Sequence, residues 1–117
     1  MRLRLFTNFF ISLLVTANTF AEEVVNVYTS RHYAIDKQIY KIFTEETGVR
    51  VREISAKDQI LLERLKNEGA TSPADVLILA DAARLWRATR RGLFQKYQNE
   101  SIDQRIPKSL RSKGDWV

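Results

Sequence analysis

Three times in succession, a short apolar run is followed by a longer segment with helical spacing, and this alternation constrains the fold more than any other feature. Strands that alternate with helices form a parallel sheet with right-handed crossovers. The first run is Val24–Thr29, and a helix is predicted from about Ile35 to Thr47, where Gly48 ends it. The sequence therefore predicts an α/β fold in which a short polar turn joins the first strand to the first helix.

The apolar positions of the first two helices recur at helical intervals. In the first helix, they are Ile35, Ile39, Ile42 and Phe43. The second unit is a strand over Val49–Ile54 followed by a helix over Lys57–Glu68. That second helix is expected to place Ile60, Leu61 and Leu65 on one side.

The third unit begins with Asp75–Ala80, a nearly continuous apolar run of the kind expected in a strand covered on both faces. Asp81 can cap the helix that follows, Ala82–Arg91. Its predicted buried stripe is Ala82, Leu85, Trp86 and Thr89, and Leu93-Phe94 are expected to fold back on the core. Farther on, a helical turn is predicted over Asn99–Arg105 and the start of a strand over Gly114–Val117.

The turn after the first strand holds the only histidine of the chain, His32, directly followed by Tyr33. In open α/β sheets, ligands bind outside the carboxyl ends of the strands, where this turn lies. An imidazole and a phenol are both able to ligate a metal. The turn is therefore the candidate ligand site. Tyr28 in the strand and Tyr40 on the helix are interpreted as packing residues.

The first 21 residues have the pattern of a secretory signal peptide. A basic start is followed by an apolar stretch, and the small residue Ala21 precedes Glu22. The apolar stretch is shorter than the roughly 20 residues that span a bilayer. We predict cleavage after Ala21 and a periplasmic location; the alternative is an uncleaved membrane anchor.

Composition excludes several classes of site. The chain has no cysteine, which rules out a lipoprotein anchor, a disulfide and iron–sulfur ligation, and one histidine cannot build a multi-histidine zinc site. The net charge is +5, but the only tight basic cluster is Arg84, Arg87, Arg90 and Arg91, without the strand-borne aromatic platform of single-strand binders. No nucleic-acid partner is expected, and the arginines are interpreted as a solvated helix face.

Five blocks of sequence, in this order, resemble the ferric-ion-binding periplasmic proteins of ABC importers, and most of all the cyanobacterial-type iron(III) solute-binding proteins. They are Val25–Tyr33, Phe43–Val49, Leu61–Gly69, Ser72–Ile78 and Ala82–Ala88. The resemblance implies a two-lobed type II periplasmic-binding-protein fold with iron in the cleft. It also implies that residues 22–117 form the N-terminal part of lobe 1, truncated, of a longer chain that is monomeric when complete.

The resemblance further implies which residues bind the ion. Tyr33 matches the family's first-turn tyrosine ligand, and His32 matches a neighbouring histidine that is a ligand in some members. The remaining ligands, a Tyr-Tyr pair among them, come from the second half of the family's chain. Fe(III) is a hard cation that prefers anionic oxygen, and a bound cation keeps a phenol deprotonated at neutral pH. The partners implied are the ferric ion and a membrane permease, with no catalysis.

Two other functions are consistent with parts of the turn. The same fold could hold an oxyanion or a small organic acid with Ser30, Arg31 and the amides that begin the first helix. Arg31 is otherwise interpreted as a solvated charge. A secreted enzyme with His32 as general base is disfavoured because the chain has no Gly-x-Ser-x-Gly motif and no cysteine nucleophile.

Overall fold

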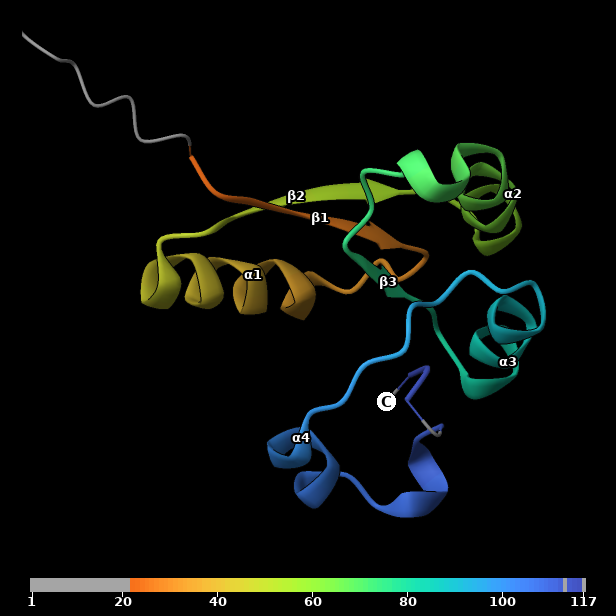
Figure 1. Cartoon of the computed structure of the whole chain (residues 1–117). Helices are drawn as coiled ribbons and strands as arrows, with labels where there is room; N and C mark the ends of the chain where they lie inside the picture. The colour runs from red at the N-terminus through yellow and green to blue at the C-terminus, as the bar shows by residue number, and fades with distance from the viewer. Residues whose placement is uncertain (1–21, 113, 117) are drawn as a thin grey trace, which may run out of the picture.

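The computed structural model describes residues 22–112 and 114–116 (Figure 1). The predicted signal peptide, residues 1–21, lies outside the described residues. Among the residues that are described, no helix is long and apolar enough to cross a membrane.

Three parallel strands form the sheet, in the order β2-β1-β3. They are β1 (Val24–Thr29), β2 (Arg50–Ser55) and β3 (Val76–Ile78). Because β1 lies in the middle, its last three residues are all buried. The register places Thr29 opposite Ser55 on one side and Ile78 on the other, so all three strands end at the same edge of the sheet. The α/β fold with a parallel sheet is confirmed.

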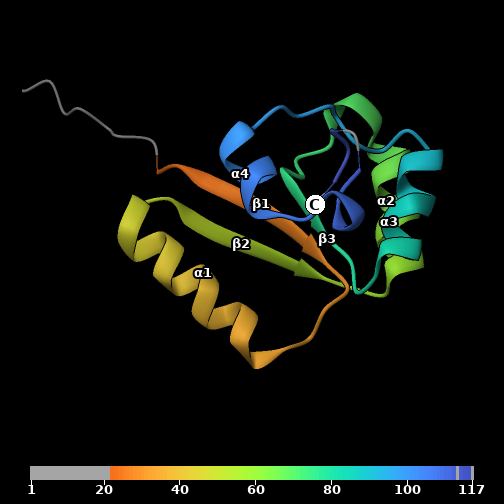
Figure 2. The ribbon, with the colours of Figure 1, turned by 90° about the horizontal axis from the view of Figure 1, so that it is seen from below.

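The helices lie on both sides of the sheet: α1 on one side, and α2 and α3 next to each other on the opposite side (Figures 1 and 2). Their bounds are Ala34–Thr47 for α1, Asp58–Glu68 for α2 and Ala82–Arg90 for α3. A short helix, α4 (Glu100–Arg105), follows, and two 3-10 turns cover Gly69–Thr71 and Lys108–Leu110. The helical turn predicted over Asn99–Arg105 is therefore present.

The core lies between the sheet and the α2–α3 pair. Leu62 from α2, Leu79 after β3 and Ala88 from α3 form its buried centre. Leu93 and Phe94 pack against that centre, as predicted. Four partly buried hydrophobic residues surround the cluster: Leu77, Leu85, Leu93 and Phe94. The core thus joins the third strand–helix unit to the second.

Helix α1 does not bury its isoleucines. Ile35, Ile39 and Ile42 are each 52% exposed, whereas Asp36 is buried and Tyr40 is half-buried. Successive residues of an α-helix lie about 100° apart, so the face that meets the sheet is adjacent to the isoleucine stripe rather than coincident with it. Within the described residues, the stripe is only partly covered.

The predicted stripes of α2 and α3 are confirmed only in part. In α2, Leu61 and Leu62 are buried, whereas Ile60 is 57% exposed. In α3, Leu85 and Thr89 are half-buried beside the buried Ala88, whereas Ala82 is exposed and Trp86 is 59% exposed. Trp86 is instead a surface residue with the Arg90 guanidinium carbon 5.7 Å from its ring centroid. The helix cap by Asp81 is confirmed: its carboxylate accepts a hydrogen bond from the Arg84 backbone N–H at 2.9 Å.

The third strand is shorter than the apolar run suggested. It covers Val76–Ile78 rather than Asp75–Ala80, and Val76 is 42% exposed. In the described sheet β3 pairs only with β1, so one edge and part of its surface have no neighbour. No strand forms over residues 114–116, where a further strand was predicted to begin.

One buried hydrogen-bonded group ties β1 to α2. Tyr28 is fully buried, and its hydroxyl donates to both carboxylate oxygens of Glu68, at 3.0 and 3.2 Å. The Ser72 hydroxyl and Arg64 Nε also donate to Glu68, each at 2.6 Å. These donors lower the pKa of Glu68 from its ordinary value of 4.5, with the Ser72 hydrogen bond as the largest cause. The pKa of Tyr28 is raised, first by its burial and then by Glu68.

We expect Glu68→Gln to destabilise the fold by about 1 kcal/mol at pH 7, because it weakens the hydrogen bonds that three residues donate to a charged acceptor. A carboxyl group with a lowered folded pKa stabilises the fold above its unfolded pKa and loses that contribution as the pH falls. The difference between Glu68→Gln and the parent should therefore shrink below pH 4.5. Thermal unfolding followed by circular dichroism at pH 7 and pH 3.5 measures this. Glu46→Gln is the control because Glu46 is exposed on α1. Equal destabilisation at both pH values would contradict the prediction.

Candidate metal site

Hydrogen bonds to β3 and to the last residue of β1 fix the backbone of the turn between β1 and α1. The Ser30 N–H donates to the Ile78 carbonyl at 3.1 Å, which attaches the turn to β3. The Arg31 N–H donates to Thr29 Oγ1 at 3.0 Å. The chain direction after β1 is therefore set before the first turn of α1 begins, and the turn presents its side chains at the carboxyl edge of the sheet.

An ion pair joins the turn to the start of α1. Arg31 Nη2 is 2.6 Å from Asp36 Oδ1, and the Asp36 side chain is only 9% exposed. Asp36 belongs to the first turn of α1, where the helix dipole favours a negative charge. The interpretation of Arg31 as a solvated charge is therefore wrong, because the Arg31 guanidinium is held by the carboxylate of Asp36. Its guanidinium carbon lies 5.2 Å from the centroid of the Tyr33 ring.

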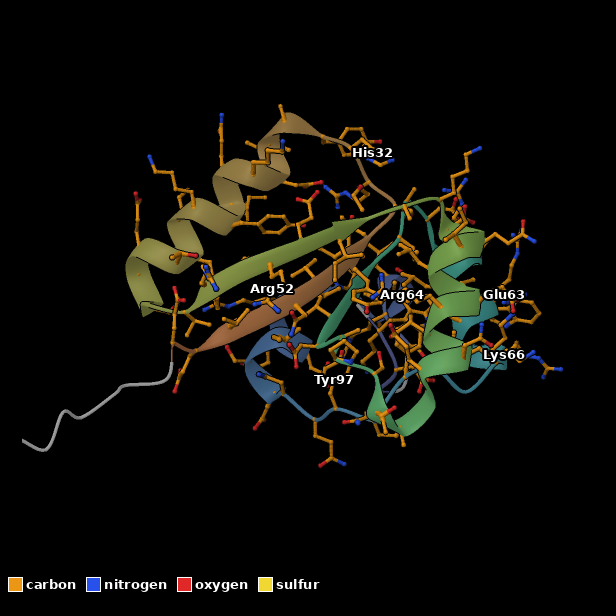
Figure 3. The ribbon with its side chains drawn as sticks, turned by 90° about the horizontal axis from the view of Figure 1, so that it is seen from above. His32, Arg52, Glu63, Arg64, Lys66 and Tyr97 are labelled. Carbon is orange, nitrogen blue, oxygen red and sulfur yellow. The ribbon has the colours of Figure 1, made fainter. Side chains whose placement is uncertain are left out.

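Tyr33 and His32 both reach the surface at this edge. Tyr33 is the N-cap residue of α1, in extended conformation, and it is 61% exposed. His32 is also exposed, and its Nδ1 atom lies 3.1 Å from Ser55 Oγ at the end of β2. Figure 3 shows His32 near the arrowhead of β2, with Arg52 farther back along the same strand.

A polar cavity of about 450 Å³ adjoins the turn. It is lined by Arg31, His32, Tyr33, Ala34, Asp36, Lys37, Glu53 and Ser55. The structure thus brings the two predicted ligand residues to one cavity, and it adds Asp36, Glu53 and Ser55, which the sequence analysis did not single out. Glu53 and Ser55 are two residues apart on β2, so their side chains share a face of the sheet.

The donor set at this edge is incomplete for a metal ion. Within the described residues, no three carboxylate, imidazole or thiol side chains come together in an arrangement that could hold a metal. Tyr28 and Tyr40 are unsuitable as additional phenolate ligands because burial raises the pKa of both phenols. This agrees with their interpretation as packing residues. The turn can supply one phenol oxygen and one imidazole nitrogen to an ion that other groups must also bind.

Comparison with known proteins finds several to which this chain is similar. No protein-family model matches the chain. Iron uptake protein A1 of Synechocystis sp. (strain ATCC 27184 / PCC 6803 / Kazusa) is 50% identical over 96 residues, which cover 81% of this chain and 27% of that protein. The thiamine-binding periplasmic protein of Escherichia coli (strain K12) is 36% identical over 89 residues, covering 72% and 27%.

A solved structure agrees with the first of these matches. The Trichodesmium protein IdiA (FutA), in complex with iron and citrate ligands, superimposes with a TM-score of 0.75 at 44% identity. The alignment covers 80% of this chain and 29% of that one. The chain thus spans between a quarter and a third of the length of these relatives.

The parallel sheet and its flanking helices are those of a partial lobe of a type II periplasmic binding protein. Within that class, the chain is similar to the cyanobacterial iron uptake proteins and to the iron-bound and apo FutA structures, and it matches only part of their length.

Proposed function

We propose that this chain contributes part of the ferric-ion site of a periplasmic solute-binding protein, which captures Fe(III) for delivery to the membrane permease of an ABC importer. In this proposal, Tyr33 binds the ion through its phenolate oxygen and His32 binds it through an imidazole nitrogen. The chain acts by binding, and no catalytic step is involved. When complete, the protein is a monomer.

The observation that carries the proposal is the position of Tyr33 beside His32 at the carboxyl edge of the sheet. The phenol is 61% exposed, which leaves its oxygen accessible to an ion in the adjoining cavity. The names of the relatives connect these similar proteins to iron. Two side chains cannot fill an octahedral coordination sphere, so the other ligands must come from outside the described residues.

The second candidate, an oxyanion or small organic acid bound by Ser30 and Arg31, has less support. The Arg31 guanidinium already pairs with Asp36 at 2.6 Å, which reduces its capacity to recognise an anion. The Ser30 hydroxyl oxygen and Arg31 Nε are both buried without a hydrogen-bond partner among the described residues, and these two atoms favour this candidate.

The ligand assignment can be tested in a grafted protein, in which residues 22–117 replace the matching segment of Synechocystis iron uptake protein A1. We expect this grafted protein to bind Fe(III) with a visible phenolate-to-iron absorption band, and residues 22–117 alone to bind weakly or not at all. Tyr33→Phe removes one oxygen ligand and keeps the ring. We expect it to weaken ferric affinity at least about tenfold, which corresponds to about 1.4 kcal/mol, and to alter the band.

Tyr40→Phe is the matched control. Its hydroxyl is buried without a hydrogen-bond partner among the described residues, so its removal should change neither the spectrum nor the affinity. An unchanged band and affinity in Tyr33→Phe would show that Tyr33 is not an iron ligand. A colourless complex with an oxyanion would favour the second candidate instead.

The periplasmic location depends on the leader, and its removal is a separate prediction. We expect export to cleave the chain between Ala21 and Glu22, since a small residue there ends a basic and then apolar segment. Mass spectrometry of the exported protein should find Glu22 at the N-terminus. Replacing Ala21 by Leu should slow cleavage, whereas a soluble exported product that retains Met1 would disprove it.

A further inference from the structure

We propose that Ser55 is the residue that positions His32 for metal binding: its hydroxyl holds Nδ1 of the imidazole and leaves Nε2 as the atom that meets the ion. This inference rests on the proposed function, since it concerns the same ferric site. It adds a residue from β2 to a site otherwise built from the turn after β1. The observation behind it is the 3.1 Å separation of Ser55 Oγ and His32 Nδ1.

The sheet fixes where this hydroxyl lies. Ser55 is the last residue of β2 and is paired in register with Thr29, the last residue of β1. The Ala56 N–H donates to the Thr29 carbonyl at 3.2 Å, which continues the pairing just past the strand end. Backbone hydrogen bonds therefore fix the position of the Ser55 main chain next to the end of β1.

The orientation of Ser55 is equally determined by the strand. Side chains alternate between the two faces of a strand, so Ser55 shares a face with Glu53, and both line the cavity that His32 also lines. A slip of one residue in the β1–β2 register would turn Ser55 to the opposite face and remove the contact.

The chemistry of imidazole explains why the contact matters. Neutral imidazole has one N–H and one nitrogen lone pair, and the hydrogen bond made by one nitrogen determines which nitrogen can ligate a metal. If Nδ1–H donates to Ser55 Oγ, the lone pair lies on Nε2. Nε2 has no hydrogen-bond partner among the described residues, and His32 is exposed. A metal-ligating histidine typically donates its other ring N–H in this way.

Two substitutions in the grafted protein test the inference. Ser55→Ala removes the hydroxyl, and Ser55→Thr keeps it. We expect Ser55→Ala to weaken ferric affinity by about tenfold, the lower end of the effects known for such supporting residues, and Ser55→Thr to restore most of it. Ser101→Ala, at an exposed position on α4, is the control and should leave the affinity unchanged.

Nitrogen-15 NMR of labelled histidine gives a second readout that does not depend on affinity. The His32 signal is assigned by its loss in His32→Ala, and Ga(III) serves as a diamagnetic substitute for Fe(III). In the parent and in Ser55→Thr, we expect the Nδ1–H tautomer with Nε2 shifted by Ga(III). In Ser55→Ala, we expect a mixture of tautomers in the metal-free protein. If Ser55 had only a structural role, Ser55→Ala would change neither the tautomer of His32 nor the Ga(III)-induced shift of Nε2.

The outcomes separate the two proposals. If Tyr33→Phe weakens ferric binding while Ser55→Ala changes neither the affinity nor the tautomer, the role of Ser55 is disproved and the iron site stands. An Nε2–H tautomer in the Ga(III)-loaded parent also disproves it. If the grafted protein binds no ferric ion at all, the proposed function and this inference both fall.

Discussion

The pairing of β1 with strands on both sides is the constraint on which the rest of the structure depends. Because β1 is central, its last three residues, Val27, Tyr28 and Thr29, are buried, and the turn that follows emerges in the middle of the sheet edge. Helix α1 leads from there to β2 on one side, while β3 lies on the other. Such a point, where successive connections leave in opposite directions, is where open α/β sheets bind ligands.

The turn at that point is held by hydrogen bonds and by charge. The Ser30 N–H bonds to β3, and the Asp36 carboxylate on α1 pairs with Arg31. A buried ion pair adds little to stability, since desolvation of the two charges opposes their attraction. Its effect here is geometric: Arg31 cannot move away from the Tyr33 ring without leaving a buried carboxylate unpaired. The first turn of α1 and the turn before it therefore form one preorganised unit.

That unit presents the Tyr33 side chain to solvent. Tyr33 stands exposed, whereas Tyr28 and Tyr40 are buried or half-buried with raised pKa values. The fold thus separates its phenols by environment. Burial raises the pKa of the Tyr28 and Tyr40 phenols, whereas the Tyr33 side chain at the sheet edge is open to solvent.

The sequence by itself determined the features that depend on neighbouring residues. The bounds of β1, the stop at Gly48, the cap at Asp81 and the place of Tyr33 after the first strand could all be predicted, because strand propensity, glycine conformation and capping act within a few residues. The resemblance of five sequence blocks also predicted the kind of relatives that the comparisons found. These signals are local or follow the order of the chain.

Only the tertiary structure decided what depends on distant segments. Periodicity finds an apolar stripe but not the neighbour that covers it, so the exposure of Ile39 and Trp86 could not be foreseen. The contact between Ser55 and His32 joins residues 23 positions apart and exists only because the β1–β2 register aligns the two strand ends. The sequence supplies the chemical groups of this site, and the pairing of the strands determines which of these groups come into contact.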